Sequence, residues 1–456
     1  MTAKQARVGA YVLIILAGVA VARAGADGAP TASCGTLLPP RAGAYLGVFP
    51  DFNRPPTVTE DDVEAAKIDA FAFRAGHRLA WVYFTQSWYR GMAFPRERVL
   101  TIWRSGAIPY IAFLPHSGVF YGAGRLQDYP ERRFTLQRII DGGFDRPLRA
   151  WAKAARETNI PLLLSFGAEI NDEWGPWSAK WNGAGETAGY GDPTYPDGAE
   201  RFRDAYRHVV TLFRAEGATN VTWFFHADTY PPHQWWNTLD WYYPGDAYVD
   251  WLGISNYGSL TASGPIVNFA AKLDASGVYG LLARLSARPM AVVEMGVVDG
   301  PAGVKPEWIR RAFAALRSGR YPRMRGAVWW DWRYQGIDTR IDSSPAALAA
   351  FRAGIEGRFF DARPRFTGTC APRTPRGLRA SDGGSAAIVR LAWSPVPNAA
   401  WYEVIRDGIR IATTAVCHYE DQATTPAWQY RYVVRAVNPV GRSGPSRATI
   451  GVHAVS

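Results

Sequence analysis

The sequence predicts a (β/α)₈ barrel followed by a small all-β domain. The chain has 456 residues, which is more than a single hydrophobic core usually holds. Between residues 44 and 360, short apolar runs alternate with helical patterns, as in proteins built from repeated strand–helix units. After residue 366 the helical patterns stop, and short alternating strands separated by turn residues replace them.

Eight apolar runs are expected to form the barrel strands. They cover residues 45–49, 79–85, 109–114, 162–166, 221–226, 249–255, 290–295 and 327–332. Helical patterns cover residues 60–74, 95–105, 146–158, 198–216, 267–286, 306–318 and 344–356. A doubly wound open sheet is the alternative, but no glycine-rich phosphate-binding loop follows an early strand. We therefore favour the barrel, whose active site is expected at the C-terminal ends of the strands.

The N-terminus has the pattern of a secretory signal. Lys4 and Arg7 precede an apolar run at residues 8–22, which is short for a membrane span. We expect residues 1–24 to be a signal peptide, 25–40 a short N-terminal segment and 41–366 the barrel. The protein is then expected to be secreted without stable membrane insertion. An N-terminal anchor that stays uncleaved is the alternative.

The cysteines and the charge limit the class of protein. Cys34 precedes the first barrel strand and Cys370 follows the last barrel helix, so in an exported protein these two are expected to form a disulfide. Cys417 is then left over, and the cysteines form no Cys/His cluster of the kind that binds zinc. The net charge of +11 comes mostly from arginine, without a dense basic block or a nucleic-acid motif. We expect a monomer that binds no nucleic acid.

Two of the predicted strands end in glutamates. Glu169 follows the fourth strand and Glu294 lies at the end of the seventh. These strands sit on opposite sides of an eight-stranded ring, so the two carboxyl groups are expected to face each other across its mouth. Glycoside hydrolysis needs two carboxyl groups that converge on one bond, and aromatic rings such as those after Glu169 stack on sugar faces. Glu173, in the same loop, is the alternative candidate for the acid role.

The same motifs resemble those of retaining glycosidases whose acid/base and nucleophile end strands four and seven. The resemblance is strongest to glycoside hydrolase family 26, typified by β-mannanases, and spans roughly residues 40–360. The matching residues are Glu169, Asn171 and Trp174, then Tyr257, Glu294, Trp329 and Trp330, with His116 at the end of strand three. The chain departs from the family at Ala168 and Ser255, where His and Asp are common.

The resemblance implies a role for each residue. Glu294 would be the nucleophile, held by Tyr257, and Glu169 would be the acid/base. The expected substrate contacts, taken from the family or from their place at strand ends, are His116, Asn171, Trp174, Trp177, His226, Tyr257, Trp329 and Trp330, with Trp330 as the floor of the sugar site. No metal or organic cofactor is required.

The implied substrate is a polysaccharide or oligosaccharide, cleaved by endo action, with a mannan-like β-glycan favoured. A β-glucan or xylan is the first alternative. The second alternative is a barrel that binds carbohydrate without turnover.

The C-terminal part has a separate organisation. Residues 367–375 are rich in Pro and Thr, which is typical of a linker. Short strands are expected at residues 387–393, 401–406, 409–414 and 430–437. The stretch at residues 430–443, together with Trp393 and the strand around Tyr402, resembles a fibronectin type III module. This resemblance implies a β-sandwich over residues 376–456 that spaces or docks the barrel.

Overall fold

The structure is a computed structural model that describes residues 33–52, 60–118, 130–229, 234–261, 264–301, 303–334, 337–361, 363–382 and 388–453. The expected signal peptide at residues 1–24 lies outside the described residues. From Ser33 onward the chain forms one compact unit. Among the described residues, no helix is both long enough and apolar enough to span a lipid bilayer.

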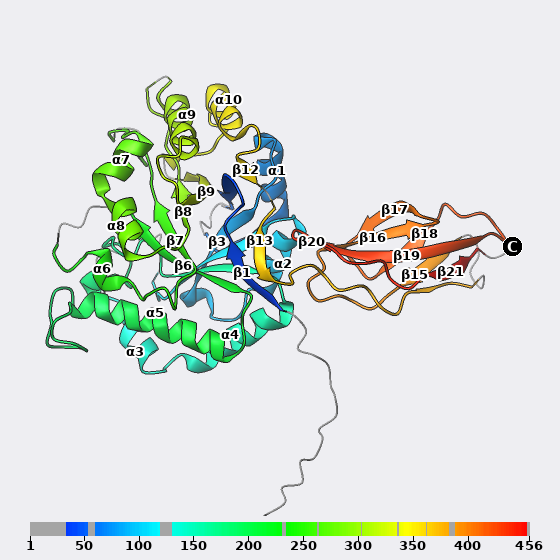
Figure 1. Cartoon of the computed structure of the whole chain (residues 1–456), viewed down its shortest axis with the longest axis horizontal. Coiled ribbons are helices and arrows are strands. Elements are labelled where there is room, and N and C mark those ends of the chain that lie inside the picture. The colour runs from blue at the N-terminus through cyan, green and yellow to red at the C-terminus, as the bar shows by residue number, and fades with distance from the viewer. Residues whose placement is uncertain are drawn as a thin grey trace, which may run out of the picture. The chain divides into compact units, whose positions relative to one another are not determined.

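Eight parallel strands close into a barrel, as the sequence predicts (Figure 1). Each strand pairs with the next in the chain, and β2 pairs with β9 to close the ring. The barrel strands are β2 (Ala44–Pro50), β3 (Trp81–Ser87), β4 (Ile108–Leu114), β5 (Leu162–Phe166), β6 (Val221–Asp228), β7 (Trp251–Ser255), β8 (Met290–Met295) and β9 (Met324–Asp331). The short strand β12 (Phe360–Asp361) pairs with β2 at the base of the ring.

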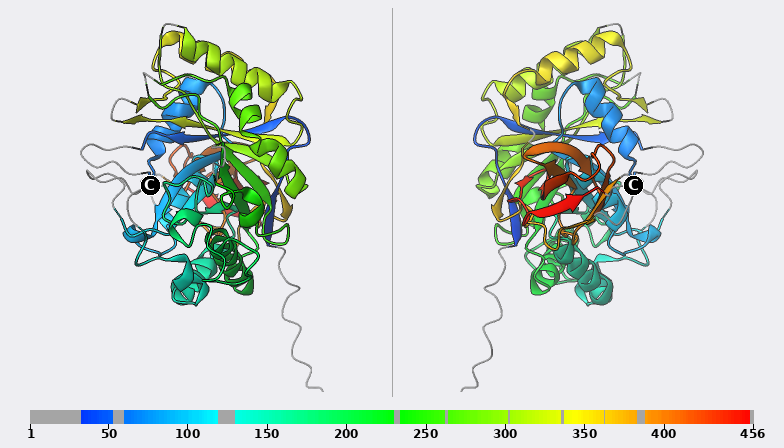
Figure 2. Two further views of the ribbon diagram at one scale, coloured as in Figure 1. Left: turned by 90° about the vertical axis from the view of Figure 1, so that its left-hand side faces the viewer. Right: turned by 90° about the vertical axis from the view of Figure 1, so that its right-hand side faces the viewer.

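Helices cover the outside of the barrel. They are α1 (Ala65–Ala75), α2 (Arg96–Arg104), α3 (Leu136–Ile140), α4 (Asp145–Thr158), α5 (Asp197–Ala215), α6 (Leu239–Tyr242), α7 (Phe269–Ser276), α8 (Val278–Leu285), α9 (Val304–Arg317) and α10 (Pro345–Ile355). Helices α9 and α10 lie on the opposite side of the strands from α4 and α5 (Figure 2). The single helix expected at residues 267–286 is two helices, because Gly277 adopts a left-handed conformation with φ 68° and ends α7.

Aromatic side chains fill the barrel interior. Because side chains alternate along a strand, every second residue of these buried strands points inward. The inward rings form a continuous series of contacts in which the ring of Tyr83 stacks on that of Tyr110, with centroids 4.7 Å apart. The other members are Tyr45, Trp81, Trp251, Phe224, Trp330 and Phe49. The barrel is therefore a packed core, and reactive groups have room only at its rim.

A disulfide joins the two ends of the barrel region. Strand β1 (Cys34–Leu38) pairs antiparallel with β13 (Arg365–Gly368). Next to this pair, Cys34 and Cys370 are bonded, with Cα atoms 4.4 Å apart. Cys417 is a free, half-buried cysteine.

The C-terminal part is all-β, as the sequence predicts. One sheet contains β14 (Arg379–Ala380), β15 (Val389–Ala392) and β18 (His418–Asp421). The other contains β16 (Trp401–Arg406), β17 (Ile409–Thr414), β19 (Gln429–Asn438), β20 (Gly441–Arg442) and β21 (Thr449–Val452). Between them lies a second apolar core, which includes Leu391, Trp393, Tyr402, Val404 and Tyr432. The sequence did not predict the short strands β14, β18, β20 and β21.

Candidate active site

The structure brings Glu169 and Glu294 together at the C-terminal rim of the barrel. Glu169 lies three residues after β5, and Glu294 lies in β8. One oxygen of each carboxyl group and one ring nitrogen of His226 all lie within 4.8 Å of one another. His226 comes from β6, between the two glutamate strands in chain order. Two carboxyl groups and one imidazole therefore lie side by side at the rim.

Two tyrosines hold the carboxyl group of Glu294. The Tyr257 hydroxyl donates to Oε2 at 2.8 Å, as expected from the sequence. The Tyr83 hydroxyl donates to Oε1 at 3.0 Å. Burial raises the pKa of Glu294 to about 7, while the two tyrosine hydrogen bonds act in the opposite direction. Both oxygens are thus fixed by donors that favour the charged form.

Tyr83 was missed at the level of the sequence. It lies in the middle of the apolar run of β3, where an aromatic residue is usually packing. Its position in the strand identifies it. Tyr83 comes two residues after the inward-facing Trp81, and because side chains alternate along a strand, it also points into the barrel. Its ring does pack inside, at 5.3 Å from that of Trp330, and only its hydroxyl reaches the rim.

Glu169 lies in a strained backbone conformation. Its φ is 49°, in the left-handed region that residues other than glycine seldom adopt. Two residues earlier, Gly167 has φ 68°, and a Cβ there would lie 2.9 Å from the ring of Trp177. The chain therefore turns sharply after β5, and this turn delivers the Glu169 side chain to the rim.

The environment of Glu169 favours its protonated form. The Trp174 indole N–H donates to Oε2 at 2.7 Å. Burial raises the pKa of Glu169 well above its usual range, and the negative charges of Asp228, Glu294 and Asp172 raise it further.

Ser255 connects His226 to the acid pair. Its hydroxyl lies 2.8 Å from Nε2 of His226. It also hydrogen-bonds the carboxyl group of Glu169, which lowers the pKa of that group against the larger effect of burial. Burial lowers the pKa of His226 to about 3, so this histidine is neutral. The Ser255 hydroxyl is thus shared by two polar groups.

Asn171 was expected to contact substrate, but the structure gives it another role. Its side-chain nitrogen donates to the Asp228 carbonyl oxygen at 3.0 Å, and its side-chain oxygen accepts from the Asp228 N–H at 2.8 Å. The residue is 1% exposed. Because one amide group bridges the loop after β5 and the end of β6, Asn171 braces the rim of the barrel.

Trp329 and Trp330 face opposite ways, so only one of them fits the expected sugar floor. The Trp330 ring lies inside the barrel and stacks on Phe49, with centroids 3.9 Å apart and planes 13° apart. The Trp329 ring packs against Trp308 of α9 and Phe351 of α10. The prediction for Trp329 is wrong, because adjacent residues of a strand point to opposite faces.

Two further predicted contacts lie deeper than expected. Trp177 is 1% exposed and donates its indole N–H to the Ala168 carbonyl oxygen at 2.8 Å. Trp177 packs beneath the turn that carries Glu169. Its predicted contact with substrate is therefore wrong. His116 is fully buried, between the rings of Tyr89 and Trp177. Burial lowers the pKa of His116 to about 4, and its contact with substrate stays a prediction.

Glu173, the alternative acid, lies apart from the pair. Its carboxylate accepts a hydrogen bond from Lys180 Nζ at 2.8 Å, and both side chains are more than a third exposed. Glu173 is therefore engaged by a lysine at the surface, outside the cluster formed by Glu169, Glu294 and His226. This environment does not suit a general acid.

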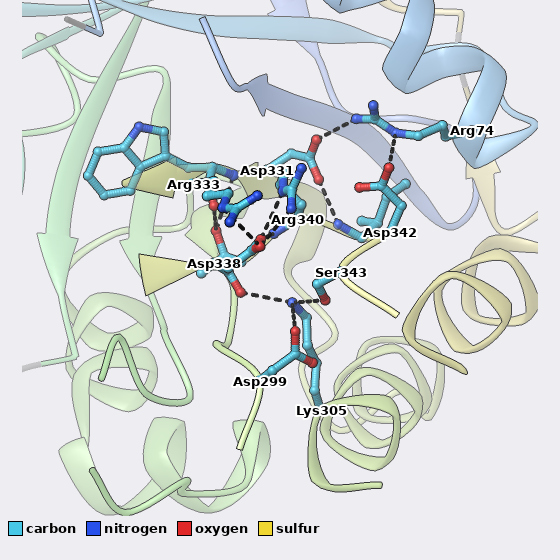
Figure 3. A network of polar contacts seen from close by, with 12 residues as sticks. Arg74, Asp299, Lys305, Asp331, Arg333, Asp338, Arg340, Asp342 and Ser343 are labelled. Carbon is cyan, nitrogen blue, oxygen red and sulfur yellow. Dashed lines mark hydrogen bonds and ion pairs between the residues drawn. The ribbon is translucent and has the colours of Figure 1, made fainter. Parts of the chain in front are cut away.

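A polar network anchors the chain after Trp330 (Figure 3). Asp331 is buried and lies 2.7 Å from the Arg74 guanidinium. The Lys305 side chain is 1% exposed, and its Nζ donates to the Ser343 hydroxyl at 2.7 Å and the Asp338 carbonyl oxygen at 3.0 Å. These contacts tie β9, the hairpin β10 (Arg333–Tyr334)–β11 (Ile337–Asp338) and the start of α9 together. These contacts anchor the chain immediately after Trp330.

Part of this chain is similar to a known family. Residues 137–299 match the profile described as Glycosyl hydrolase family 26. The chain is 32% identical over 290 residues to Endoglucanase H of Acetivibrio thermocellus, which covers 63% of this chain and 29% of that protein. The chain thus spans less than a third of the length of this curated relative.

Solved structures give matches of low identity. The catalytic domain of a family 26 endo-β-1,4-mannanase from Bacillus sp. JAMB-750 is 16% identical, with 70% of this chain and 87% of that chain covered and a TM-score of 0.48. A modular endo-β-1,4-mannanase of Cellulomonas fimi is 16% identical, with 91% and 94% covered and a TM-score of 0.46.

Proposed function

We propose that this chain is a member of glycoside hydrolase family 26 and a secreted, endo-acting, retaining β-glycosidase. One observation carries the proposal. Oxygens of Glu169 and Glu294 lie within 4.8 Å of each other at the ends of the fourth and seventh barrel strands. Retaining glycosidases hold their two carboxyl groups about 5–5.5 Å apart, whereas inverting ones need about 6.5–9.5 Å to admit a water molecule. The family match over residues 137–299 supports the same class.

The hydrogen bonds assign the two roles. Glu294 receives two tyrosine hydroxyls, which favour the carboxylate that a nucleophile requires. Glu169 lies among the negative charges of Asp228 and Asp172, which favour the proton that a general acid requires. Once Glu294 has ionised, above its pKa of about 7, the one proton that the pair keeps resides on Glu169.

In the first step, an oxygen of Glu294 attacks the anomeric carbon and forms a covalent bond to it. The bond from this carbon to the leaving oxygen breaks, and the proton of Glu169 moves to that oxygen. Trp174 donates to Oε2 of Glu169, so the transferred proton comes from Oε1. The leaving sugar departs with a neutral hydroxyl group.

In the second step, Glu169 acts as a base. It takes a proton from a water molecule whose oxygen attacks the anomeric carbon. The bond to Glu294 breaks, and Glu294 returns to its tyrosine partners as a carboxylate. Two displacements on one carbon restore the original configuration. Every group in this cycle is a side chain of the chain itself.

The substrate proposed first is a mannan-like β-glycan. Its sugar in the cleaved position would stack on Trp330, which is 6% exposed at the rim. The second candidate is a β-glucan, because the curated relative at 32% identity is named an endoglucanase. Ser255 supplies a neutral hydroxyl where the family commonly has a carboxylate. By charge, it therefore favours neither configuration of the sugar hydroxyl groups.

The C-terminal strands are proposed to form a fibronectin type III-like module over residues 376–456. The two facing sheets and the core around Trp393, Tyr402 and Tyr432 support this proposal. The module carries none of the residues of the acid pair. Its proposed role is to space or dock the barrel.

A panel of soluble β-glycans tests the function. The purified protein is expected to release reducing ends from mannan or β-glucan, with internal cleavage seen as a rapid fall in viscosity. The Glu294→Ala variant is expected to be inactive. Glu173→Ala is the matched control, because it removes a nearby carboxylate that the mechanism does not use. Activity that survives Glu294→Ala, or is abolished by Glu173→Ala, would contradict the assignment.

A further inference from the structure

One outward face of the C-terminal region is unusually rich in arginine. Residues 371–456 contain ten arginines, no lysine and five acidic residues. Five of these arginines lie on the sheet formed by β17, β16, β19 and β20, whose strands run side by side in Figure 1, and four of the five are on its outer side. We call this surface the arginine face, and it consists of Arg410, Arg431, Arg435 and Arg442.

The strand register places these four side chains on the same side. On β16 and β19, Val404 pairs with Val434 in the inner core, so their neighbours point outward. Among these outward neighbours, Arg435 pairs with Glu403. Arg431 lies four residues before Arg435 on β19, so its side chain points to the same side of the sheet. Arg410 of β17 pairs with Ile405, and Arg442 of β20 pairs with Val437, both of which are outward positions.

The arginine face lines a hollow of about 660 Å³. Its only acidic lining residue among those described is Glu403, which is 5% exposed. Glu403 lies 3.3 Å from Arg410 and 3.7 Å from Arg442. Four arginines therefore share one buried carboxylate, and the hollow keeps an excess of three positive charges.

Two of the arginines make no ion pair with any described residue. Arg431 is exposed, and Arg435 is half-buried. The Nε of Arg435 is buried without a hydrogen-bond partner among the described residues. Arg431 and Arg435 therefore bring to the hollow positive charge that no described acid neutralises.

We propose that the arginine face binds a carboxylate-bearing polysaccharide, a polymer of uronic acid units. Arginine presents a planar fork of donors that matches a carboxylate in a two-point contact. A repeating polymer offers one carboxylate after another, which suits several arginines arranged across a sheet. The choice of a glycan over other polyanions rests on the proposed function, because a uronic acid polymer that lies beside the neutral substrate would hold the barrel near that substrate.

Binding of polygalacturonate to the full chain tests the proposal. Affinity is measured by calorimetry at low salt, with dextran as the neutral polymer. The test variant is Arg410→Gln with Arg431→Gln, which leaves Arg442 beside Glu403. The control is Arg379→Gln with Arg390→Gln, which removes the same charge from the other sheet of the domain.

The test variant is expected to bind polygalacturonate about tenfold more weakly, and the control less than about twofold more weakly. Arg431→Gln alone, at an exposed site without an ion pair, is expected to weaken binding about threefold and serves if the double variant does not fold. Higher salt is expected to weaken binding by the wild type, since the contacts are between charges.

Three results would overturn the proposal. These are no binding of polygalacturonate at low salt, equal loss in the test and control variants, and tighter binding of DNA or phosphatidylglycerol vesicles at the same charge concentration. Hydrolysis of a neutral oligosaccharide is measured on the same samples. An active enzyme that does not bind polygalacturonate refutes this proposal alone, whereas binding without hydrolysis of any glycan refutes the proposed function alone.

Discussion

Removing the Tyr257 hydroxyl tests how the structure keeps Glu294 charged. In the Tyr257→Phe variant, Oε2 of Glu294 loses a donor at 2.8 Å in a buried site. A hydrogen bond to a charged group contributes roughly 1.5–3 kcal/mol, and one pKa unit corresponds to about 1.36 kcal/mol. The pKa of Glu294 is therefore expected to rise by about 1–2 units from its value near 7.

The assay is the pH dependence of kcat/KM on an activated aryl glycoside. Such a substrate needs little help from the acid, so the acid limb of the profile reports the ionisation of Glu294 in the free enzyme. The acid limb is expected to move to higher pH in Tyr257→Phe. Tyr83→Phe is expected to move it in the same direction, because Tyr83 donates to the other oxygen of Glu294.

Tyr321→Phe is the matched control. Its hydroxyl donates to Asp274 at 2.8 Å, away from the acid pair, so it reports general destabilisation. An acid limb that stays in place in Tyr257→Phe, or moves to lower pH, would refute the view that the hydroxyl stabilises the carboxylate.

Other predictions follow from the acid pair and the disulfide. Burial raises the pKa of Glu294 from 4.5 to about 7, so the folded state loses stability as pH rises from 4.5 through 7. At pH 8 the ionised acid costs the fold about 3 kcal/mol, so Glu294→Gln should unfold at higher temperature than the wild type. The difference in unfolding temperature should narrow at pH 4. A difference that does not depend on pH would contradict this. Glu169→Ala should keep activity on substrates with good leaving groups, whereas Glu294→Ala should lose it on all substrates, as shown by rates on a series of aryl glycosides. Replacing Cys34 and Cys370 by Ser should lower the free energy of unfolding by up to about 4–5 kcal/mol, and an unchanged denaturation midpoint would contradict this.

The barrel could be predicted because its strands are buried on both faces. Runs such as residues 162–166 and 290–295 are apolar except for Ser165 and Glu294, and they appear in the structure with those bounds. The positions of Glu169 and Glu294 followed from the same reasoning, because strand ends mark the rim. The break at Gly277 was missed, since glycine is compatible both with a helix interior and with a helix end.

The site contacts were harder to predict than the strands. Trp329 and Trp330 are adjacent and identical, and only the register with neighbouring strands decides which one faces the barrel interior. Tyr83 was missed because a tyrosine in an apolar run gives the same signal whether or not its hydroxyl reaches a polar partner. Asn171 was assigned to substrate from the family resemblance, and its contact with Asp228 was missed because the two residues are 57 positions apart in the chain. These contacts depend on tertiary geometry.

The stereochemistry of the first product tests the central claim most directly. Hydrolysis of a β-linked oligosaccharide is followed by proton NMR from the first minutes, before the anomers equilibrate. Because Glu169 and Glu294 lie within 4.8 Å of each other, the β-anomer should appear first and the α-anomer only later by mutarotation. Initial appearance of the α-anomer would show inversion and would contradict the assignment of Glu294 as the nucleophile.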